Sequence, residues 1–467
     1  MRAATLSLVL LAWAPISLVG QKNGGVTIWL TNGDKSALFD PTLPPQPFER
    51  PRNQNPTIVV DDRQTFQTMD GFGFTLTGGS AQHLMRMSAA GRAALLQELF
   101  GVADKDAGVS YLRVSIGASD WSSRVFTYDD APPGQTDAAL RLFSLDEDRR
   151  DVIPALREIL KVNPRIQILA SPWTAPSWMK TNAAPKGGSL KPECYAAYAG
   201  YFVKYIQGMK AEGIPIAAVT VQNEPLNGKN TPSMIVQAPE EAAFVARYLG
   251  PAFRQAKIKT RIILYDHDCD QPQYPMSILA DARAARFADG SAFHLYAGGV
   301  EAMTQVRNAY PSKNIYFTEQ MVTGSVEGQA AIDVSAPVAR LLIGATRNWS
   351  RTVLLWNLAA DSRNEPHTGD SGCATCQGAI TLDGDAVKRN VAYYAMAHAS
   401  RFVRPGSVRI GSTSLAELPN VAFKAPGGKR VLLVANPAGA AQTFNIQYRD
   451  AAIVTTLKPK SVGTYVW

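Results

Sequence analysis

The sequence lacks features that several protein classes require. After the first twenty residues, no stretch is long and apolar enough to form a membrane helix. There is no glycine-rich phosphate loop, no dinucleotide-binding fingerprint and no histidine-rich ligand spacing. The 47 Lys and Arg exceed the 39 Asp and Glu by a net +8, but they form no long basic run of the kind that nucleic-acid binders cluster. We therefore expect no cofactor, no metal ion, no integral membrane segment and no nucleic-acid partner.

The first twenty residues have the pattern of a secretory signal. Arg2 is followed by apolar runs at 6–11 and 16–19, and polar residues begin at Gln21. This segment is too short to span a bilayer with its flanks and is typical of a signal peptide. We expect residues 1–20 to be removed from a secreted protein, either extracellular or periplasmic, with the cleavage point left open.

Cysteine is scarce, with four residues in 467. Cys373 and Cys376 form a Cys-x-x-Cys pair in a glycine-rich loop, a pattern found in half a zinc site or in a redox pair. No second such pair is present to complete four zinc ligands. In an exported protein the pattern favours a local disulfide. Cys194 and Cys269 both follow predicted strands, and whether they pair is left open.

Eight short β-rich runs recur with helical or loop sequence between them. They lie at 71–76, 111–116, 166–170, 217–222, 261–265, 292–296, 315–318 and 352–356. Between several of them, apolar residues recur at helical spacing, as in the segment 198–209. Strand and helix repeated eight times predicts a parallel (β/α)₈ barrel, the TIM barrel, over residues 67–399.

The two ends of the chain have a different character. Short alternating runs at 415–423, 430–435, 442–448 and 453–467 are broken by Pro and Gly, which predicts an all-β region at 400–467. The runs 26–30 and 58–60 are similar. We expect residues 21–66 to supply N-terminal strands to one β-sandwich with this C-terminal region. The proline-rich segment 40–56 is interpreted as a surface connector.

Two carboxylates end two of the eight runs. Glu224 closes the run that continues through Asn223, and Glu319 closes the run 314–318. The carboxyl ends of barrel strands converge on one cleft, so the two side chains should face each other. Hydrolysis of a glycosidic bond needs such a pair, one to protonate the leaving oxygen and one to attack the anomeric carbon. An isolated Glu is usually a solvated surface charge, but both of these follow buried strands, where an unpaired charge is costly.

Several long motifs resemble a known family. They are the segments 71–73, 170–182, 188–190, 218–225, 317–319 and 355–359, together with the closing residues 464–467. On these motifs the chain resembles glycoside hydrolase family 30, which includes lysosomal glucosylceramidase and microbial β-1,6-glucanases. The resemblance runs from Val26 to Trp467.

The resemblance implies roles for individual residues. Glu224 corresponds to the acid/base and Glu319 to the nucleophile of a retaining β-glycosidase, whose carboxyl groups lie roughly 5 to 5.5 Å apart. A general acid needs a raised pKa, whereas the nucleophile stays ionised and benefits from donors such as Arg113 and Tyr296. Asn223 is expected to donate to the 2-hydroxyl of the sugar.

Aromatic and polar residues at other strand ends complete the expected site. Indole and phenol rings pack well against sugar C–H faces, so Trp173, Trp178, Trp356 and Tyr296 are the expected walls. For Trp178, core packing remains equally open. The expected binding residues also include Asn357 and His294, with His294 as a positioning partner and not a metal ligand. The acidic and histidine residues at 266–268 are interpreted as loop charges.

One departure from glucosylceramidase-type members favours a subfamily. Those members carry an aspartate at the position of Gly78, where it is expected to hold the outer hydroxyls of a terminal glucose. Its loss should open the pocket to a chain linked through O6. The loop 367–378 also looks like that of β-1,6-glucanase-type members. We therefore expect a monomeric endo-β-1,6-glucanase acting on a β-glucan or β-glucoside. The alternatives are a glucosylceramidase-like exo-β-glucosidase or another β-glycosidase of the same family and, more remotely, a non-catalytic carbohydrate-binding barrel.

Overall fold

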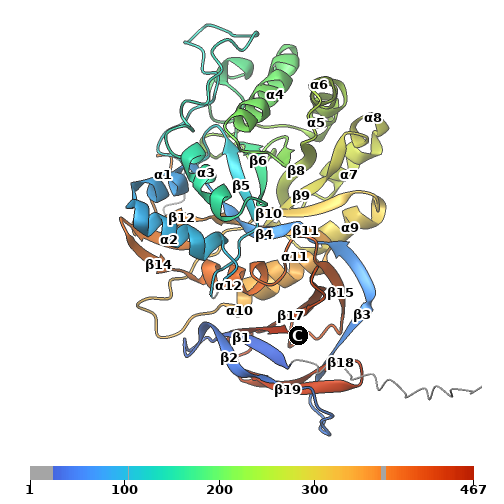
Figure 1. Ribbon diagram of the computed structural model, residues 1–467. Coiled ribbons are helices and arrows are strands. Elements are labelled where there is room, and N and C mark those ends of the chain that lie inside the picture. The colour runs from blue at the N-terminus through green and yellow to red at the C-terminus, as the bar shows by residue number, and fades with distance from the viewer. Residues whose placement is uncertain (1–24, 104, 370–374) are drawn as a thin grey trace, which may run out of the picture.

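The computed structural model describes residues 25–103, 105–369 and 375–467. The predicted signal peptide, residues 1–20, lies outside them. The chain forms a barrel wrapped by helices and, beneath it, a β-sheet region that contains both ends of the described chain (Figure 1). Within the described ranges, no helix has the length and apolarity needed to cross a membrane.

Eight parallel strands close the barrel in the order β10-β11-β4-β5-β6-β7-β8-β9. Each of the eight runs expected from the sequence becomes one of these strands, so this prediction is confirmed. Nearly every residue of these strands is buried, because their inner faces pack together and helices cover their outer faces. Their bounds are β4 (Gly71–Thr75), β5 (Tyr111–Ile116), β6 (Gln167–Pro172), β7 (Ala218–Thr220), β8 (Arg261–Cys269), β9 (Ala288–Gly298), β10 (Asn314–Glu319) and β11 (Ser350–Asn357).

Helices surround the barrel, and their buried faces follow the predicted helical spacing. In α4 (Tyr195–Ala211), for example, Tyr198, Phe202 and Tyr205 are buried against the strands. The others are α1 (Gly78–Arg86), α2 (Ala89–Phe100), α3 (Val152–Val162), α5 (Ala238–Phe244), α6 (Gly250–Gln255), α7 (Gln273–Ala280), α8 (Ala282–Ala285), α9 (Glu301–Ala309), α10 (Ser335–Pro337), α11 (Gly344–Arg347) and α12 (Val391–Ser400). Short π-helical segments, Val245–Leu249 and Val338–Ile343, precede α6 and α11.

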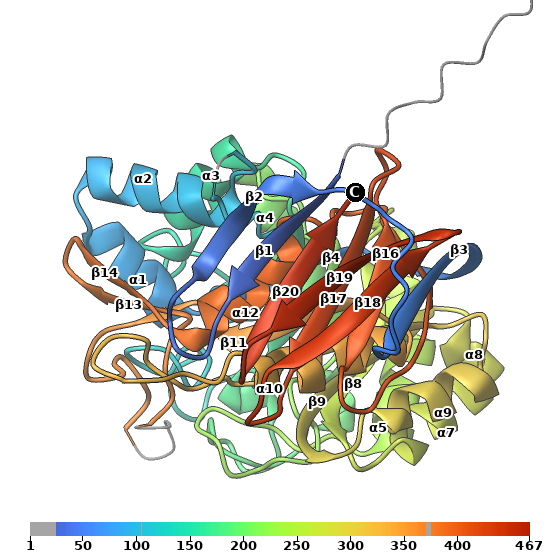
Figure 2. The same ribbon diagram turned by 90° about the horizontal axis from the view of Figure 1, so that it is seen from below.

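Nine strands from both ends of the chain form the second region, in the order β19-β18-β3-β15-β16-β17-β20-β1-β2. Figure 2 shows these strands lying across the underside of the barrel. N-terminal strands therefore join the C-terminal region, as the sequence predicts. The bounds are β1 (Val26–Thr31), β2 (Leu38–Gln46), β3 (Thr57–Thr68), β15 (Val408–Ser412), β16 (Asn420–Lys424), β17 (Arg430–Asn436), β18 (Gln442–Tyr448), β19 (Ala451–Leu457) and β20 (Ser461–Val466).

Residue alternation along β17 explains why this region packs on both sides. Val431 and Leu433 join the core shared with the barrel, whereas Leu432 and Val434 join a second core with Phe444 of β18. Successive side chains of a strand point to opposite faces, so one strand serves two cores. The sheet folds over the second core, with β18 and β19 on one side and β17, β20 and β1 on the other, and forms a sandwich.

Helix α12 fastens the two regions together. His398, buried in α12, hydrogen-bonds through one ring nitrogen to Thr31 of β1 and through the other to Thr464 of β20. Arg347 of α11 also reaches Ser412 of β15. Because these contacts are buried and polar, they fix the position of the sheet on the barrel more specifically than apolar packing alone.

Three details differ from the expectation. The proline-rich segment 40–56 is not simply a connector, because β2 lies partly within it as an edge strand paired with β1, a position that tolerates proline. The run 453–467 is divided between β19 and β20. A short three-stranded sheet of β12 (Ala359–Ala360), β13 (Ile380–Asp383) and β14 (Ala386–Arg389) was not foreseen.

Candidate active site

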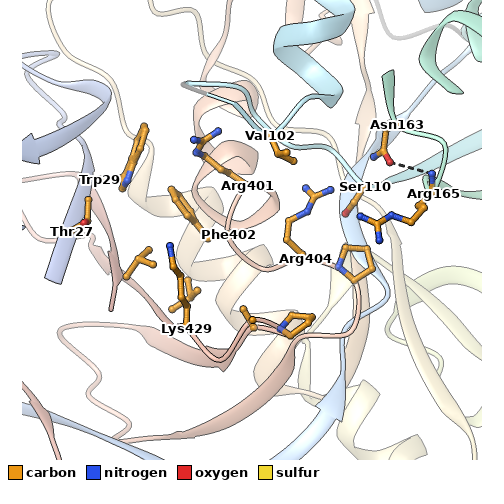
Figure 3. Close-up of a pocket in the computed structure, with 16 residues that line it drawn as sticks. Thr27, Trp29, Val102, Ser110, Asn163, Arg165, Arg401, Phe402, Arg404 and Lys429 are labelled. Carbon is orange, nitrogen blue, oxygen red and sulfur yellow. Dashed lines mark hydrogen bonds between the residues drawn. The ribbon is translucent and has the colours of Figure 1, made fainter. Parts of the chain in front are cut away.

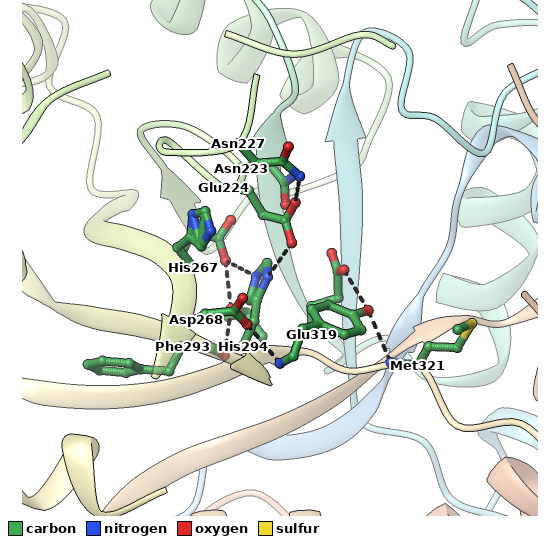
Figure 4. A network of polar contacts seen from close by, with 12 residues as sticks. Asn223, Glu224, Asn227, His267, Asp268, Phe293, His294, Glu319 and Met321 are labelled. Atoms are coloured by element: carbon green, nitrogen blue, oxygen red, sulfur yellow. Dashed lines mark hydrogen bonds and ion pairs between the residues drawn. The ribbon is translucent and has the colours of Figure 1, made fainter. Parts of the chain in front are cut away.

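Glu224 and Glu319 meet at the carboxyl end of the barrel, as the strand-end argument predicts. Glu319 is the last residue of β10, and Glu224 follows the end of β7 by four residues. Both side chains point into one space (Figure 4), and one oxygen of each lies within 4.8 Å of the other. This separation resembles that of retaining glycosidases and is shorter than the separation of about 6.5 to 9.5 Å that inverting enzymes need for a water molecule.

Two donors hold the Glu319 carboxylate. Arg113, at the centre of β5, donates from Nη1 to Oε2 at 2.5 Å, and the Tyr296 hydroxyl donates to Oε1 at 3.0 Å. Burial raises the pKa of Glu319 above its ordinary value, against the positive charges of His294 and Arg113. A carboxylate that is both oriented and more basic than usual is a better nucleophile wherever the pH keeps it ionised.

Glu224 has different partners and a backbone that aims its side chain. Its φ is 45°, a left-handed value that a residue other than glycine rarely adopts, and its N–H donates to the Asp266 carbonyl at 2.9 Å. Asn227 Nδ2 donates to Oε2 at 2.7 Å, and His294 Nδ1 lies 3.3 Å from Oε1. Burial acts to raise the pKa of Glu224, but the hydrogen bond and charge of His294 outweigh it and lower the pKa to about 2.

Asp266 is the hub of the site, which corrects its interpretation as a loop charge. The carboxylate is fully buried and accepts hydrogen bonds from Arg113 at 2.8 Å and from Thr220 at 2.7 Å. It also accepts from Thr318 at 2.6 Å and lies 3.1 Å from His294 Nε2. Through these contacts, one side chain positions both the arginine that holds Glu319 and the histidine that contacts Glu224.

A bulge in β8 delivers Asp266 to this position. Tyr265 and Asp266 have φ values of 75° and 62°, and the pairing of β8 with β9 shifts register between Tyr265 and His267. The extra residue turns its side chain inward, as β-bulges near active sites commonly do. The displaced N–H of Tyr265 is not left unpaired, because it donates to the buried carboxylate of Glu241 at 3.1 Å.

His294 carries the proton of this cluster. Burial acts to lower its pKa, but the charge of Glu319 and the hydrogen bonds to Asp266 and Glu224 raise it to about 10. His294 is therefore cationic near neutral pH. The sequence predicts a raised pKa for the general acid, Glu224. In the structure the pKa of Glu224 is lowered, and the proton is held by His294, which contacts Glu224.

The cleft above the two glutamates is an open cavity of about 550 Å³. Trp356 and Tyr296 line it as expected, and Tyr296 is 44% exposed. Trp173 stands directly behind Trp356, with ring centroids 5.6 Å apart, and Arg113 lies 4.8 Å from the Trp173 ring. Trp178 is not part of this wall. It is buried, donates to Asp129 and borders a separate hollow.

Two asparagines occupy different positions. Asn223 accepts from Arg113 Nη2 through its amide oxygen at 2.6 Å, so its amide nitrogen remains to donate, as the predicted contact with a 2-hydroxyl requires. Asn357 does not line the cleft. It accepts from the hydroxyl groups of Thr77 and Ser80, at 2.9 and 2.6 Å, and ties the start of α1 to the end of β11.

Asp120 lines the cleft and was missed in the sequence. Its carboxyl pKa is raised to about 8 by burial and by the charges of Glu319 and Glu224, and Oδ1 is buried without a partner among the described residues. Gly78, in contrast, borders another hollow with Ser122 and Glu147. Gly78 is not among the residues that line the cleft, so the structure gives no support to the expectation that it opens the cleft. Asp120 follows β5, and the strand-end rule could have found it.

The cysteines and the possible metal ligands complete the survey. Cys194 and Cys269 are free and buried, so they do not pair. Cys376 lines the cleft, but Cys373 lies outside the described residues and their disulfide stays a prediction. Within the described part of the chain, Glu224, His294 and Glu319 are the group close enough to hold a metal ion. Both ring nitrogens of His294 already face carboxylates, so a metal would have to replace its bond to Glu224.

Comparison with known proteins decides the family. The model of the glycosyl hydrolase family 30 TIM-barrel domain matches residues 69–403, and that of the family 30 beta sandwich domain matches residues 406–465. The chain belongs to glycosyl hydrolase family 30. It is a glycoside hydrolase, and its barrel and sandwich are those of family 30.

Individual relatives of family 30 cover nearly the whole chain. An endo-1,6-beta-D-glucanase of Neurospora crassa is 34% identical over 433 residues, which are 88% of this chain and 88% of the relative. A solved endo-beta1,6-glucanase has a TM-score of 0.87 at 34% identity, covering 95% of this chain and 99% of that one. The mouse lysosomal acid glucosylceramidase is 28% identical, over 88% of this chain and 83% of its own length.

Proposed function

We propose that the chain is an endo-β-1,6-glucanase that cleaves β-1,6-glucan with retention of anomeric configuration. The observation that carries the mechanism is the approach of Glu224 and Glu319 to within 4.8 Å across one cleft. The linkage rests on the relatives, since the endo-1,6-beta-D-glucanases are 32 to 34% identical and the mouse glucosylceramidase is 28% identical. An open cleft also suits a chain that continues beyond the cleavage point.

In the first step Glu319 attacks the anomeric carbon and forms a glycosyl ester, and the bond from that carbon to the leaving oxygen breaks. The charge of Glu319 is the main influence that raises the pKa of His294, and ester formation removes that charge. The His294 proton is thereby released through the 3.3 Å contact to Glu224, which passes it to the leaving oxygen. Arg113 and Tyr296 hold the attacking carboxylate in line.

In the second step water attacks the same carbon from the side of the departed sugar. Glu224, now ionised, accepts a proton from this water and returns it to His294, whose pKa is raised again when the ester bond breaks and the charge of Glu319 is restored. Two inversions at one carbon give net retention. Asn223 contributes a hydrogen bond that strengthens as positive charge develops at the sugar ring, and Asp120 is placed to bind the sugar hydroxyls that enter the cleft.

Product analysis tests this proposal. The purified enzyme is incubated with pustulan (a β-1,6-glucan), laminarin (mainly β-1,3) and a glucosyl ceramide. We expect oligosaccharides from pustulan whose newly formed reducing ends are initially β, as seen by proton NMR. Glucose released only from the lipid would refute the glucanase assignment and favour the exo-β-glucosidase alternative. Initially α products from pustulan would refute retention.

We propose in addition that the protein is secreted, is a monomer and carries a Cys373–Cys376 disulfide. The support is the signal-like sequence of residues 1–20 and the Cys-x-x-Cys spacing in an exported chain. N-terminal sequencing of protein from the culture medium tests the first point, and light scattering tests the second. Alkylation with and without reductant, followed by peptide mass analysis, tests the third. Retention of residues 1–20 on an intracellular product would contradict secretion.

A further inference from the structure

A second large cavity lies at the opposite end of the barrel from the glutamates. It measures about 660 Å³ and sits between the sheet region and the amino ends of β5 and β6 (Figure 3). Its walls come from β1, the loops before β5 and β6, the segment after α12 and the turn before β17. This volume is typical of a small-molecule site. The reaction proposed above makes no use of it.

Cationic side chains from three separate segments face this cavity. Arg165 precedes β6, Arg401 and Arg404 follow α12, and Lys429 precedes β17. No Asp or Glu is among the described residues that line it. Neither the Arg165 guanidinium nor the Lys429 ammonium has a hydrogen bond or ion pair with another described residue. The cavity therefore presents the charges of Arg165 and Lys429, which no described lining residue neutralises.

Arg404 is fixed in place without a counter-charge. Its guanidinium donates to the carbonyl oxygens of Gly108 and Ser400, which orient the side chain but carry no full negative charge. Burial and the nearby charges of Arg165 and Arg401 lower the pKa of Arg404 to about 10. Mutual repulsion of this kind is relieved when an anion enters.

Arginines elsewhere in this protein pair with carboxylates, unlike Arg404. Arg92 pairs with Glu158 at 2.7 Å, and Arg389 pairs with Glu98 at 2.5 Å. Arg165, Arg404 and Lys429 come from three separate segments and line one cavity without a carboxylate among its described lining residues. Guanidinium groups match the geometry of phosphate oxygens with paired N–H donors. The charge pattern and the fixed Arg404 thus suit an oxyanion from outside the chain.

The remaining lining is apolar and indicates what the anion is attached to. Trp29 and Phe402 form an aromatic wall with ring centroids 5.4 Å apart, and Val431 and Val466 lie beside it. We propose that this cavity binds a phosphate monoester, with the phosphoryl group among the cations and an apolar organic group against Trp29 and Phe402. This site is independent of the glucanase proposal.

Binding measurements on the full-length mature enzyme test the site. Phenyl phosphate, inorganic phosphate and phenol are titrated by calorimetry at constant ionic strength. The double variant Arg165→Ala/Lys429→Ala is compared with Arg150→Ala/Lys259→Ala, which removes the same charge from exposed positions away from the cavity. We expect saturable binding of phenyl phosphate that weakens about tenfold in the cavity variant and stays unchanged in the control.

Titrations with inorganic phosphate, phenol and phospholipid vesicles show whether the bound phosphoryl group belongs to a soluble monoester, to free phosphate or to a lipid. Tighter binding of phenyl phosphate than of inorganic phosphate, and no binding of phenol, would support the apolar contact. Absence of saturable binding of phenyl phosphate, or equal weakening of that binding in both double variants, would overturn the proposal. If the enzyme binds only to vesicles of anionic phospholipid, and the cavity variant does not, the proposal is also overturned, because the site would then bind a membrane surface and not a soluble phosphate monoester. Thermal unfolding of each variant confirms that it is folded.

Discussion

The two ends of the barrel each contain an ion cluster, half-buried at the amino end and buried at the carboxyl end, and the clusters differ in the sign of their surplus charge. At the amino end Asp70 lies between Arg261 and Arg351, at 2.8 and 2.6 Å, and none of the three lines the active-site cleft. At the carboxyl end three carboxylates share one arginine and one histidine, beneath an open cavity. The first cluster has two cations for one carboxylate and therefore a surplus positive charge. The second holds a surplus carboxylate facing the cleft, which chemistry on a substrate requires.

Backbone geometry separates the two ends in the same way. Glu224, Tyr265 and Asp266 adopt left-handed φ at the carboxyl end, whereas Asp70, Arg261 and Arg351 do not. Strained residues persist only where surrounding contacts hold them, and they concentrate at functional sites. A charged cluster alone therefore does not mark the active site of this barrel. The combination of surplus negative charge, local strain and access to solvent does.

Replacement of Glu319 by Gln should have the largest effect. It removes the nucleophile while keeping the side-chain volume, so kcat on pustulan should fall on the order of 10⁴-fold or more. The exposed Glu327→Gln is a matched control and should retain activity. Trapping of the wild type with a 2-deoxy-2-fluoro glucoside and peptide mapping should place the label on Glu319. Label on another residue would contradict the assigned role.

Replacement of Glu224 by Gln should come next. Loss of the acid/base should lower kcat on pustulan on the order of 10³-fold. An aryl glucoside with a good leaving group needs little protonation, so its first step should be largely spared and a burst of released phenol should appear. Equal slowing of that burst and of pustulan hydrolysis would argue against Glu224 as the acid. Unchanged activity of the wild type in EDTA is expected for this metal-free chemistry.

Asp266→Asn tests whether the hub acts through His294. Asp266 helps to raise the pKa of His294, so its loss should lower that pKa and move the alkaline limb of kcat/KM to lower pH. The acid limb reports Glu319, whose raised pKa requires activity to fall as pH drops through a value above the ordinary 4.5. We expect a loss of about 100-fold in kcat near neutral pH.

The matched control for Asp266→Asn is Asp70→Asn, at the other end of the barrel. It also replaces an acidic residue between two cations, and it should lower the unfolding temperature without moving either limb of the pH profile. A shifted pH profile in both variants would show that any buried charge loss has this effect. The positioning role of Asp266 would then have no support.

These comparisons also show which parts of the fold and of the site could be predicted from the sequence. The strand-end rule located Glu224 and Glu319, because eight buried runs with polar ends specify both the barrel and its active face. It failed for Asp266, since a bulge with two left-handed residues is not visible in a pattern of hydrophobic residues. It also misjudged β2, where three prolines concealed an edge strand. The spacing of apolar residues, and with it the buried strands and helix faces, can be predicted from the sequence. The local register of strand pairing depends on tertiary contacts and cannot.

Asp120→Asn should have a moderate effect on substrate binding. Its buried Oδ1 lacks a partner among the described residues and faces the cleft beside both glutamates. Loss of a hydrogen bond that involves this carboxyl group should lower kcat/KM on pustulan about 10- to 100-fold, mainly through KM. The measurement is steady-state kinetics on defined β-1,6-linked oligosaccharides. An unchanged KM would remove Asp120 from the binding site.

Gly78→Asp should have the smallest effect, although the sequence pointed to this position. Gly78 is the first residue of α1 and borders a hollow apart from the cleft, and a Cβ placed there would approach Ser122 Oγ at 3.2 Å. An acidic residue in the first helical turn is favourable. We expect the ratio of activities on pustulan and a glucosyl lipid to change by less than about twofold. A large shift of this activity ratio toward the glucosyl lipid would show that position 78 contacts the sugar, and the start of α1 would then belong to the substrate-binding cleft.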